Sequence, residues 1–303
     1  MRADPGPAVL LVDKPRGPTS HDVVAVARRA TGIRRIGHTG TLDPFASGLL
    51  LLCVGRATRL ASLFHLLPKR YTAEVRLGVE TETDDRTGPP RAESTAWQAL
   101  RRRDLEAALR ERTGPQDQVP PAYSAKKVDG RRAHRLARAG QTPALAPTRV
   151  VVHALDLVEW DPPRVVVDAW VSTGTFVRAL ARDLGRDLGC RAHLAELRRT
   201  AIGGFEVTAA CPPAGLADPG GARLPPLEAL RWLPLRRLDE GERDAVRHGR
   251  PVDAGTIEAP AEQGFPHAPA EDAPVALVAP DRLVAVGRRD GGRLRPVIVL
   301  DAA

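Results

Sequence analysis

Residues 71–79, YTAEVRLGV, alternate between apolar and polar side chains with a period of two. In an extended strand this period places Tyr71 on the apolar face and the polar side chains on the opposite face. Residues 164–172 show a second alternation, and residues 149–158 also have the pattern of a strand. These segments predict half-buried strands that line one side of a hydrophobic core.

Helical patterns separate the strands. We expect a helix at about 21–30 that is capped by Ser20, a charged helix at 103–112, and an amphipathic helix at 177–188. Short apolar runs at 8–13 and 49–54 predict buried strands. Because strands and helices alternate irregularly, the sequence predicts an α+β fold with a mostly antiparallel central sheet flanked by helices.

A change of composition divides the chain near residue 226. Residues 209–226 are rich in Pro, Gly and Ala, and the segment beyond them carries short strand patterns with a hairpin turn at residues 290–292. We therefore expect a large domain at 1–226 and a small β-rich module at 227–303.

The charge and the cysteines narrow the functional classes. Lys and Arg number 45 against 37 Asp and Glu, a net charge of +8, which suits a polyanion such as nucleic acid and equally suits a solvated surface. Three cysteines without CxxC spacing exclude a disulfide framework and make a structural zinc site implausible.

The N-terminus lacks a signal-peptide pattern, so a cytoplasmic protein is expected. Nucleotide-loop, zinc-protease and serine-hydrolase motifs are also absent, so we expect no cofactor.

The segment RIGHTGTLDPFASGLLLL, residues 35–52, surrounds Asp43 with unusual backbone. An aspartate before a proline often only begins a turn. Here, however, Gly37, Gly40 and Gly48 allow close approach of another molecule, and Pro44 stiffens the turn. A carboxylate held in such a loop could act as a nucleophile or stabilise a cationic transition state.

Four segments, in order, resemble the motifs of the TruB-type tRNA pseudouridine synthases. They are DKPRGPTSHDVV, GHTGTLDPFASGLLLLCVGRATRL, QVPPAYSAKKVDGRRAHRLARAG and VSTGTFVRALARDLGRDLGCRAHLAELRRTAIGGF, and the resemblance covers residues 8 to 207. It implies a catalytic domain at 1–226 that isomerises a uridine in the T-loop of tRNA, position 55 in tRNA numbering. The module at 227–303 is similar to a PUA-like RNA-binding domain.

The resemblance assigns three catalytic residues. Asp43 matches the aspartate that acts at C1′ of the target nucleoside, either by a covalent bond or through proton loss at C2′. Arg178 matches the arginine that keeps this carboxylate ionised, a task that suits a permanent planar cation. Tyr71 matches the tyrosine that stacks on the uracil and could act as a base. The patterns alone would instead make Arg178 a surface residue and Tyr71 a core aromatic.

The resemblance also implies residues that bind the substrate. His38 would fill the space left by the flipped nucleotide, although a local turn contact is the simpler interpretation. Basic residues near Pro120 and Pro121 suggest a hinged flap over RNA, although a charge run usually marks a solvated face. The implied substrate-binding residues are Lys14, His38, Phe176, Leu197, Lys126, Lys127 and Arg131.

Two positions depart from the family pattern. Phe176 stands where the family usually has tyrosine, and His134 stands where an aromatic hydroxyl is common. Each change removes a hydroxyl group and leaves Asp43 in place. We therefore expect activity to survive, with an altered rate or pH dependence.

Two alternatives remain open: a pseudouridine synthase for another structured RNA, and an RNA-binding or tRNA-folding protein in which catalysis is secondary. Intact Asp43, Tyr71 and Arg178 favour catalysis, because binding alone does not require them. The stand-alone form of the family is expected, a monomer with tRNA as its partner through the T-arm, no obligatory protein partner and no membrane contact.

Overall fold

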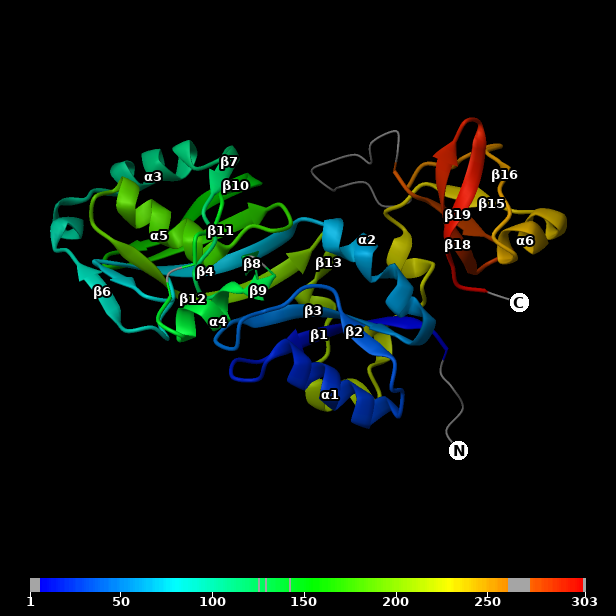
Figure 1. The fold of residues 1–303 in the computed structure, drawn as a ribbon, viewed down its shortest axis with the longest axis horizontal. Coiled ribbons are helices and arrows are strands. Elements are labelled where there is room, and N and C mark those ends of the chain that lie inside the picture. The colour runs from blue at the N-terminus through cyan, green and yellow to red at the C-terminus, as the bar shows by residue number, and fades with distance from the viewer. Residues whose placement is uncertain (1–5, 125, 129, 142, 261–272, 302–303) are drawn as a thin grey trace. The chain divides into compact units, whose positions relative to one another are not determined.

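The computed structural model describes residues 6–124, 126–128, 130–141, 143–260 and 273–301 (Figure 1). The chain forms two compact units. The first comprises Met1–Pro44, Gly48–His65 and Gly203–Ala303, and the second comprises Phe45–Ser47 and Leu66–Ile202.

The second unit contains an antiparallel sheet in the order β12-β4-β11-β10-β7. Strand β4, which pairs with β12 and β11, confirms the predicted alternation, because Tyr71, Ala73, Val75 and Leu77 are buried while Arg70 and Arg76 are exposed. The strands are β4 (Lys69–Leu77), β7 (Gly114–Gln118), β10 (Thr148–Asp161), β11 (Arg164–Val171) and β12 (Ala192–Ile202).

Two helices, α3 (Arg102–Glu111) and α5 (Val177–Asp187), pack on this sheet and on each other (Figure 1). Val177, Leu180 and Ala181 of α5 line a small apolar space together with Ala73 and Val75 of β4. The helix therefore covers the face that carries Tyr71.

The contact between α5 and the following strand is unusually close at Gly185. A Cβ atom at this position would lie 2.3 Å from the backbone nitrogen of Ala192, the first residue of β12. Only glycine allows this approach, because a side chain here would force α5 away from the start of β12.

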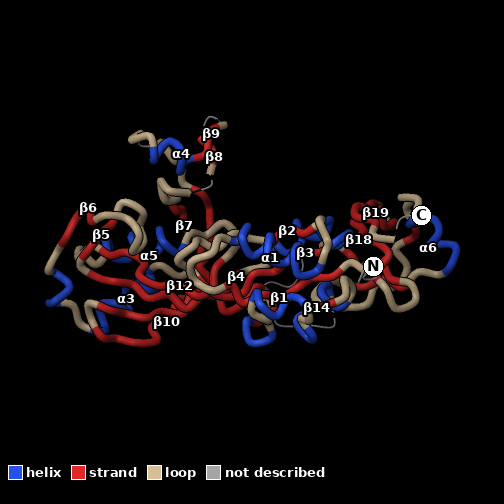
Figure 2. Tube along the Cα trace, turned by 90° about the horizontal axis from the view of Figure 1, so that it is seen from below, coloured by secondary structure: helices blue, strands red, loops and turns tan. Residues whose placement is uncertain are grey.

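A long connection joins β7 to β10, and we call residues 119–147 the insert. It contains β8 (Lys127–Val128), β9 (Arg131–Arg132) and α4 (Ala133–Arg138), which project from the sheet in Figure 2. A separate hairpin of β5 (Val79–Thr81) and β6 (Pro90–Glu93) follows β4.

The N-terminal part of the first unit pairs β1 (Ala8–Lys14) antiparallel with β3 (Ser47–Val54) and with β14 (Arg223–Leu224). The short strand β2 (Ile36–His38) pairs with β3, and α2 (Ala61–Leu66) follows later in the chain. Helix α1 (Ser20–Thr31) buries Val23, Val24 and Ala27 against β1 and β3. Both predicted apolar strands are therefore confirmed.

The N-cap of α1 differs from the prediction by one residue. Thr19, not Ser20, accepts the backbone N–H of Asp22 at 3.1 Å, and Asp22 in turn accepts the backbone N–H of Thr19 at 2.8 Å. This reciprocal pair is a capping box. Ser20 is buried, and its hydroxyl is used elsewhere.

The C-terminal residues form a second sheet in the order β15-β17-β18-β19-β16, in which β15 and β17 are parallel. Its core includes Val246 of α6 (Glu240–Arg247). The predicted hairpin at 290–292 is confirmed, because it joins β18 to β19. The strands are β15 (Leu235–Arg237), β16 (Val252–Asp253), β17 (Val275–Val278), β18 (Leu283–Asp290) and β19 (Arg293–Val299).

The α+β class, the mostly antiparallel sheet and the β-rich C-terminal module are as predicted from the sequence. The proposed boundary at residue 226 lies between β14 and β15. That residues 227–303 act as a separate RNA-binding domain stays a prediction. No helix in the described part of the chain is long and apolar enough to cross a membrane.

Candidate active site

The loop that carries Asp43 is fixed by hydrogen bonds on both sides of the carboxylate. Ser20 Oγ accepts the backbone N–H of Leu42 at 2.9 Å and donates to the Leu42 carbonyl at 3.2 Å. On the other side, the Gly17 N–H donates to the carbonyl of Pro44 at 2.8 Å. Asp43 itself is half-buried. The loop thus presents a carboxylate from a backbone that helix α1 and its N-terminal turn hold in place.

Glycine is required within this loop at Gly40, whose φ of +152° lies in a region that other residues rarely adopt. Its N–H points to Nδ1 of His38 at 3.4 Å, which is the local turn contact that the sequence pattern favoured. The His38 ring also meets the exposed His21 ring edge to face, with centroids 5.1 Å apart. The RNA-filling role of His38 stays a prediction.

Lys14 ends β1 and is fully buried, with Nζ donating to the Pro15 carbonyl at 2.8 Å. An ammonium with no exposed surface supports the backbone and does not reach an RNA phosphate in this conformation. Its assignment to substrate binding therefore stays a prediction.

In the second unit, Tyr71 and Leu197 lie on the same face of neighbouring strands. Tyr71 is 8% exposed and pairs with Arg199, while Leu197 is 7% exposed and pairs with Ala73. The tyrosine ring and an apolar side chain therefore stand beside each other on the face that α5 covers. This arrangement is suitable for stacking a flat base and excluding water from it.

Two buried cations, which the sequence reasoning missed, share this face. Arg199 is 2% exposed and Lys69 is 7% exposed. Burial and, to a smaller extent, the nearby Arg199 charge together lower the pKa of Lys69 to about 8. Both residues lie at strand positions that face the buried side of the sheet. An alternation of apolar and polar residues does not predict a charged side chain at such a position.

Arg178 is the second residue of α5 and is 6% exposed, so the surface position that the pattern alone suggested is wrong. Its Nη1 donates to the Thr83 carbonyl at 3.0 Å and lies 3.3 Å from Oδ2 of Asp85. Its Nη2 donates to the Tyr123 carbonyl at 3.0 Å. The guanidinium is thus held in one orientation by a carboxylate and two carbonyl groups.

Asp85 is itself held firmly. Its Oδ1 accepts hydrogen bonds from Thr83 Oγ1 at 2.7 Å and from the backbone N–H and hydroxyl of Thr87 at 2.9 and 2.5 Å. The neighbouring Asp84 has a φ of +59°, which is uncommon for a residue other than glycine. The sequence signal that could have identified this network is the acid pair in TETDDRTG together with two arginines four residues apart on α5.

Asp84 forms the second ion pair of this network, with Arg182 at 2.8 Å. Burial raises the pKa of Asp84, and the Arg182 and Arg178 charges oppose that rise. Asp84 and Asp85, in the loop between β5 and β6, therefore each bind an arginine of α5.

The N-terminus of α5 is attached to the end of β7. The side-chain amide of Gln118 accepts the Phe176 N–H at 2.8 Å and donates to the Phe176 carbonyl at 3.2 Å. Phe176 is half-buried and caps the helix with its backbone only. The predicted effect of its missing hydroxyl stays untested.

The insert carries the predicted basic residues. Lys126 is half-buried and Arg131 is exposed on β9. The side chains of Lys127 and His134 lie outside the described part of the structure. A basic hairpin on a projecting segment is consistent with RNA contact, which stays a prediction for Lys126, Lys127 and Arg131.

The candidate residues are divided between the two units. Asp43, Lys14 and His38 belong to the first, whereas Tyr71, Phe176, Arg178 and Leu197 belong to the second. Among the described residues there is no cluster of three or more His, Cys, Asp or Glu side chains that could hold a metal ion.

Comparison with known proteins identifies the family. Residues 28–177 match the N-terminal domain of TruB family pseudouridylate synthases, and residues 178–218 match the C-terminal domain of tRNA pseudouridylate synthase B. A protein of Thermobifida fusca described as tRNA pseudouridine synthase B is 42% identical over 96% of this chain and 97% of its own length. Another from Synechococcus with the same description is 41% identical over 96% of this chain and 97% of its own length.

Solved structures agree at the level of the fold. A chain of a Cbf5-Nop10-Gar1 complex is similar with a TM-score of 0.73 at 25% identity, covering 97% of this chain and 85% of its own. A chain of an archaeal box H/ACA sRNP Nop10-Cbf5 complex gives 0.71 at 24% identity, covering 97% of this chain and 86% of its own. On the family match and the near-full-length relatives, this chain belongs to the TruB family of pseudouridine synthases.

Proposed function

We propose that this protein converts the uridine at position 55 of the tRNA T-loop into pseudouridine. The observation that carries the proposal is the Asp43 loop, a half-buried carboxylate fixed by Ser20 and Gly17 within a chain that belongs to the TruB family. The tRNA substrate follows from relatives of about 40% identity that are described as tRNA pseudouridine synthase B.

The reaction rearranges bonds without net gain or loss of atoms. The N1–C1′ bond of uridine breaks, the uracil rotates, and C5 bonds to C1′. The proton on C5 is then released, and N1 of the product carries a proton. The step that needs help is departure of the base, because C1′ becomes electron-poor as the bond to nitrogen breaks.

Asp43 is proposed to act at this carbon. Two routes use the same carboxylate: it adds to C1′, or it promotes proton loss at C2′. Both need the ionised form, and burial beneath RNA would raise the pKa of the carboxyl group. We propose that Arg178 opposes this rise, because Asp85 and two carbonyl groups already fix the plane of its guanidinium.

Tyr71 is proposed to stack on the detached uracil, with Leu197 beside it. Their burial on one sheet face supports this role, because a stacking surface must be rigid and dry. The positive charges of Lys69 and Arg199 on the same face favour an anionic group there.

The target uridine must leave the RNA stack before any of these groups can reach it. Extrusion costs a few kcal/mol of lost stacking, and insertion of the His38 ring is proposed to recover part of this cost. The basic hairpin of the insert, with Lys126 and Arg131, is proposed to contact phosphates and to close over the bound loop.

The test is tritium release from a tRNA transcript labelled at C5 of uracil. We expect release from the transcript with uridine at position 55 and none from an otherwise identical transcript with cytidine there. Equal release from both would show that another uridine is the target. Release only from a ribosomal RNA fragment would favour the alternative of a different structured RNA.

A further inference from the structure

Arg182 stands out among the residues to which the proposed chemistry gives no role. It lies one helical turn after Arg178 on α5 and is only 6% exposed. A buried guanidinium requires a counter-charge and hydrogen bonds for its N–H groups, because its desolvation is otherwise costly. The partners of Arg182 therefore indicate what the residue is built to hold.

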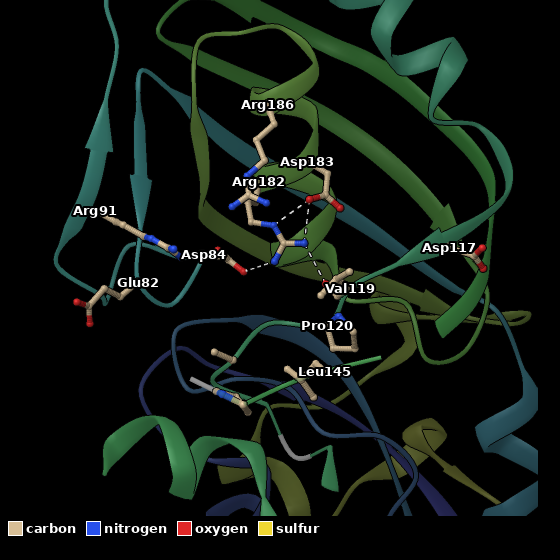
Figure 3. A pocket seen from close by; sticks show the side chains of 12 residues that line it. Glu82, Asp84, Arg91, Asp117, Val119, Pro120, Leu145, Arg182, Asp183 and Arg186 are labelled. Carbon is tan, nitrogen blue, oxygen red and sulfur yellow. Dashed lines mark hydrogen bonds and ion pairs between the residues drawn. The ribbon is translucent and has the colours of Figure 1, made fainter. Parts of the chain in front are cut away.

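Two of these partners are carboxylates. Nε donates to Asp183 Oδ1 at 2.8 Å, and Nη1 donates to Asp84 Oδ2 at 2.8 Å (Figure 3). The two acids come from the same helix and from the loop between β5 and β6. These two carboxylates alone are sufficient to fix the plane of the Arg182 guanidinium.

The third partner is the backbone of the insert. Arg182 Nη2 donates to the carbonyl of Val119 at 2.9 Å (Figure 3). Val119 is the first residue after β7, so this bond fixes the point at which the insert leaves the sheet. One turn earlier on α5, Arg178 binds the carbonyl of Tyr123 in the same way. The two arginines thus attach the first five residues of the insert to the helix.

A pocket of about 420 Å³ adjoins this attachment. Val119, Pro120 and Ala122 of the outgoing limb line it, and so do Pro143 and Leu145 of the returning limb. The base of the insert therefore borders open space on this side and is not packed continuously against α5. Hydrogen bonds such as the one from Arg182 must supply part of the constraint that packing would otherwise give.

We propose that Arg182 is a positioning residue that fixes the base of the insert against α5 and thereby prepares the insert to bind RNA. The RNA-binding part of this inference rests on the proposed function, whereas the attachment of the insert to α5 does not. Without the bond to Val119, the base of the insert is less constrained in the free protein. Binding of RNA must then also fix the insert, which weakens the apparent affinity for RNA. At saturating RNA the bound substrate holds the insert, so turnover is retained.

The test compares Arg182→Lys with Arg186→Lys. Lysine keeps the positive charge at either position but cannot bridge two carboxylates and a carbonyl in the fork geometry of arginine. Arg186 lies on the same helix and lines the same pocket, yet its hydrogen bonds go to Glu80 at 2.7 and 3.0 Å. Arg186→Lys therefore disturbs an arginine–carboxylate contact on the same helix while the Arg182 contact with Val119 stays in place.

We expect Arg182→Lys to raise the KM for tRNA about ten-fold, the factor expected for loss of one hydrogen bond from a charged group, with kcat within about two-fold of wild type. Trypsin should also cut the insert faster in the RNA-free variant, at the exposed Arg131 or Arg135. Arg186→Lys should match wild type in both measurements. A double variant, Asp84→Asn with Arg182→Gln, provides a second test that removes both members of the buried Asp84–Arg182 ion pair and leaves Asp183 with Arg112 at 3.9 Å; it should show the same rise in KM and the same faster cleavage.

Three results would overturn the proposal. Unchanged KM and unchanged cleavage in Arg182→Lys would show that the contact does not hold the insert. A lower kcat at unchanged KM would instead place Arg182 in the support of Arg178. Equal effects in Arg186→Lys would indicate general weakening of α5. If wild type releases no tritium, the proposed function fails, while the cleavage rates still decide the role of Arg182.

Discussion

Replacing Asp85 by asparagine should destabilise the second unit and impair turnover. Asp85 is 3% exposed, and its Oδ2 faces Arg178 Nη1 at 3.3 Å, while Oδ1 accepts three hydrogen bonds. Asparagine has nearly the same shape but no charge, and one of its two polar atoms is a donor. The amide must therefore turn its NH₂ group either toward Arg178 or toward the threonine donors.

The magnitude follows from the contacts that are lost. A hydrogen bond between a charged donor and acceptor contributes about 1.5–3 kcal/mol, and removing one partner of a buried ion pair costs about 3–5 kcal/mol. Arg178 keeps its bonds to Thr83 and Tyr123, so the loss should lie in the upper part of the first range and not in the second, at about 2–3 kcal/mol. For a unit of this size, that is a decrease in Tm of about 5–10 °C.

The measurement is urea and thermal unfolding of Asp85→Asn beside Asp117→Asn. Asp117 pairs with Arg149 at 3.6 Å, but the two side chains are 64% and 65% exposed, so its loss should cost less than about 0.5 kcal/mol. Turnover by folded Asp85→Asn should also fall at least about ten-fold, because Arg178 loses a group that fixes its plane. Equal stability of the two variants would refute the view that Asp85 is the structural counter-charge of Arg178.

Two further predictions concern the hydroxyl group of Ser20 and the ammonium group of Lys69. Ser20→Ala should lower the free energy of unfolding by about 1–3 kcal/mol and should also lower turnover, because it leaves the Leu42 N–H beside Asp43 without its partner. Thr19→Ala removes the N-cap of α1 and should lower the free energy of unfolding by about 1 kcal/mol. Turnover by the folded Thr19→Ala enzyme should be unchanged. Matching turnover in the two variants would contradict this distinction. The folded-state pKa of Lys69 is lowered to about 8 from 10.5, so the unfolded chain binds the extra proton between these values and stability rises with pH across that window. The stability of wild type relative to Lys69→Met should therefore increase by about 2 kcal/mol between about pH 7.5 and pH 10 in urea titrations, and a constant difference would exclude the shift.

Strands with a clear period were predictable from the sequence. The alternation from Tyr71 onward and the apolar run from Leu49 to Val54 follow from local burial, so β4 and β3 lie where they were expected. The hairpin at residues 290–292 was predictable from two adjacent glycines, which suit a tight turn.

The N-cap shows where local reasoning ends. Thr19 and Ser20 are both good capping residues, and the prediction that Ser20 caps the helix was wrong. The hydroxyl of Ser20 instead binds Leu42, which lies 22 residues away in the chain. A contact of that separation cannot be read from residues near the helix start.

Arg178 shows the same limit at the site. Its position in the first turn of α5 suggested exposure, but Asp85, 93 residues earlier, makes its burial possible. The pairing depends on how the loop between β5 and β6 meets α5, which is a property of the tertiary structure. The resemblance to a family identified Arg178, whereas the residues that hold it became visible only in the structure.

The central claim is that the Asp43 carboxylate acts on the sugar of the target uridine. Single-turnover tritium release at saturating enzyme tests it directly, with wild type and Asp43→Asn compared on the same labelled tRNA. We expect complete release by wild type and none by Asp43→Asn, although the variant should bind tRNA with nearly unchanged affinity. Release by Asp43→Asn at the wild-type rate would contradict the account.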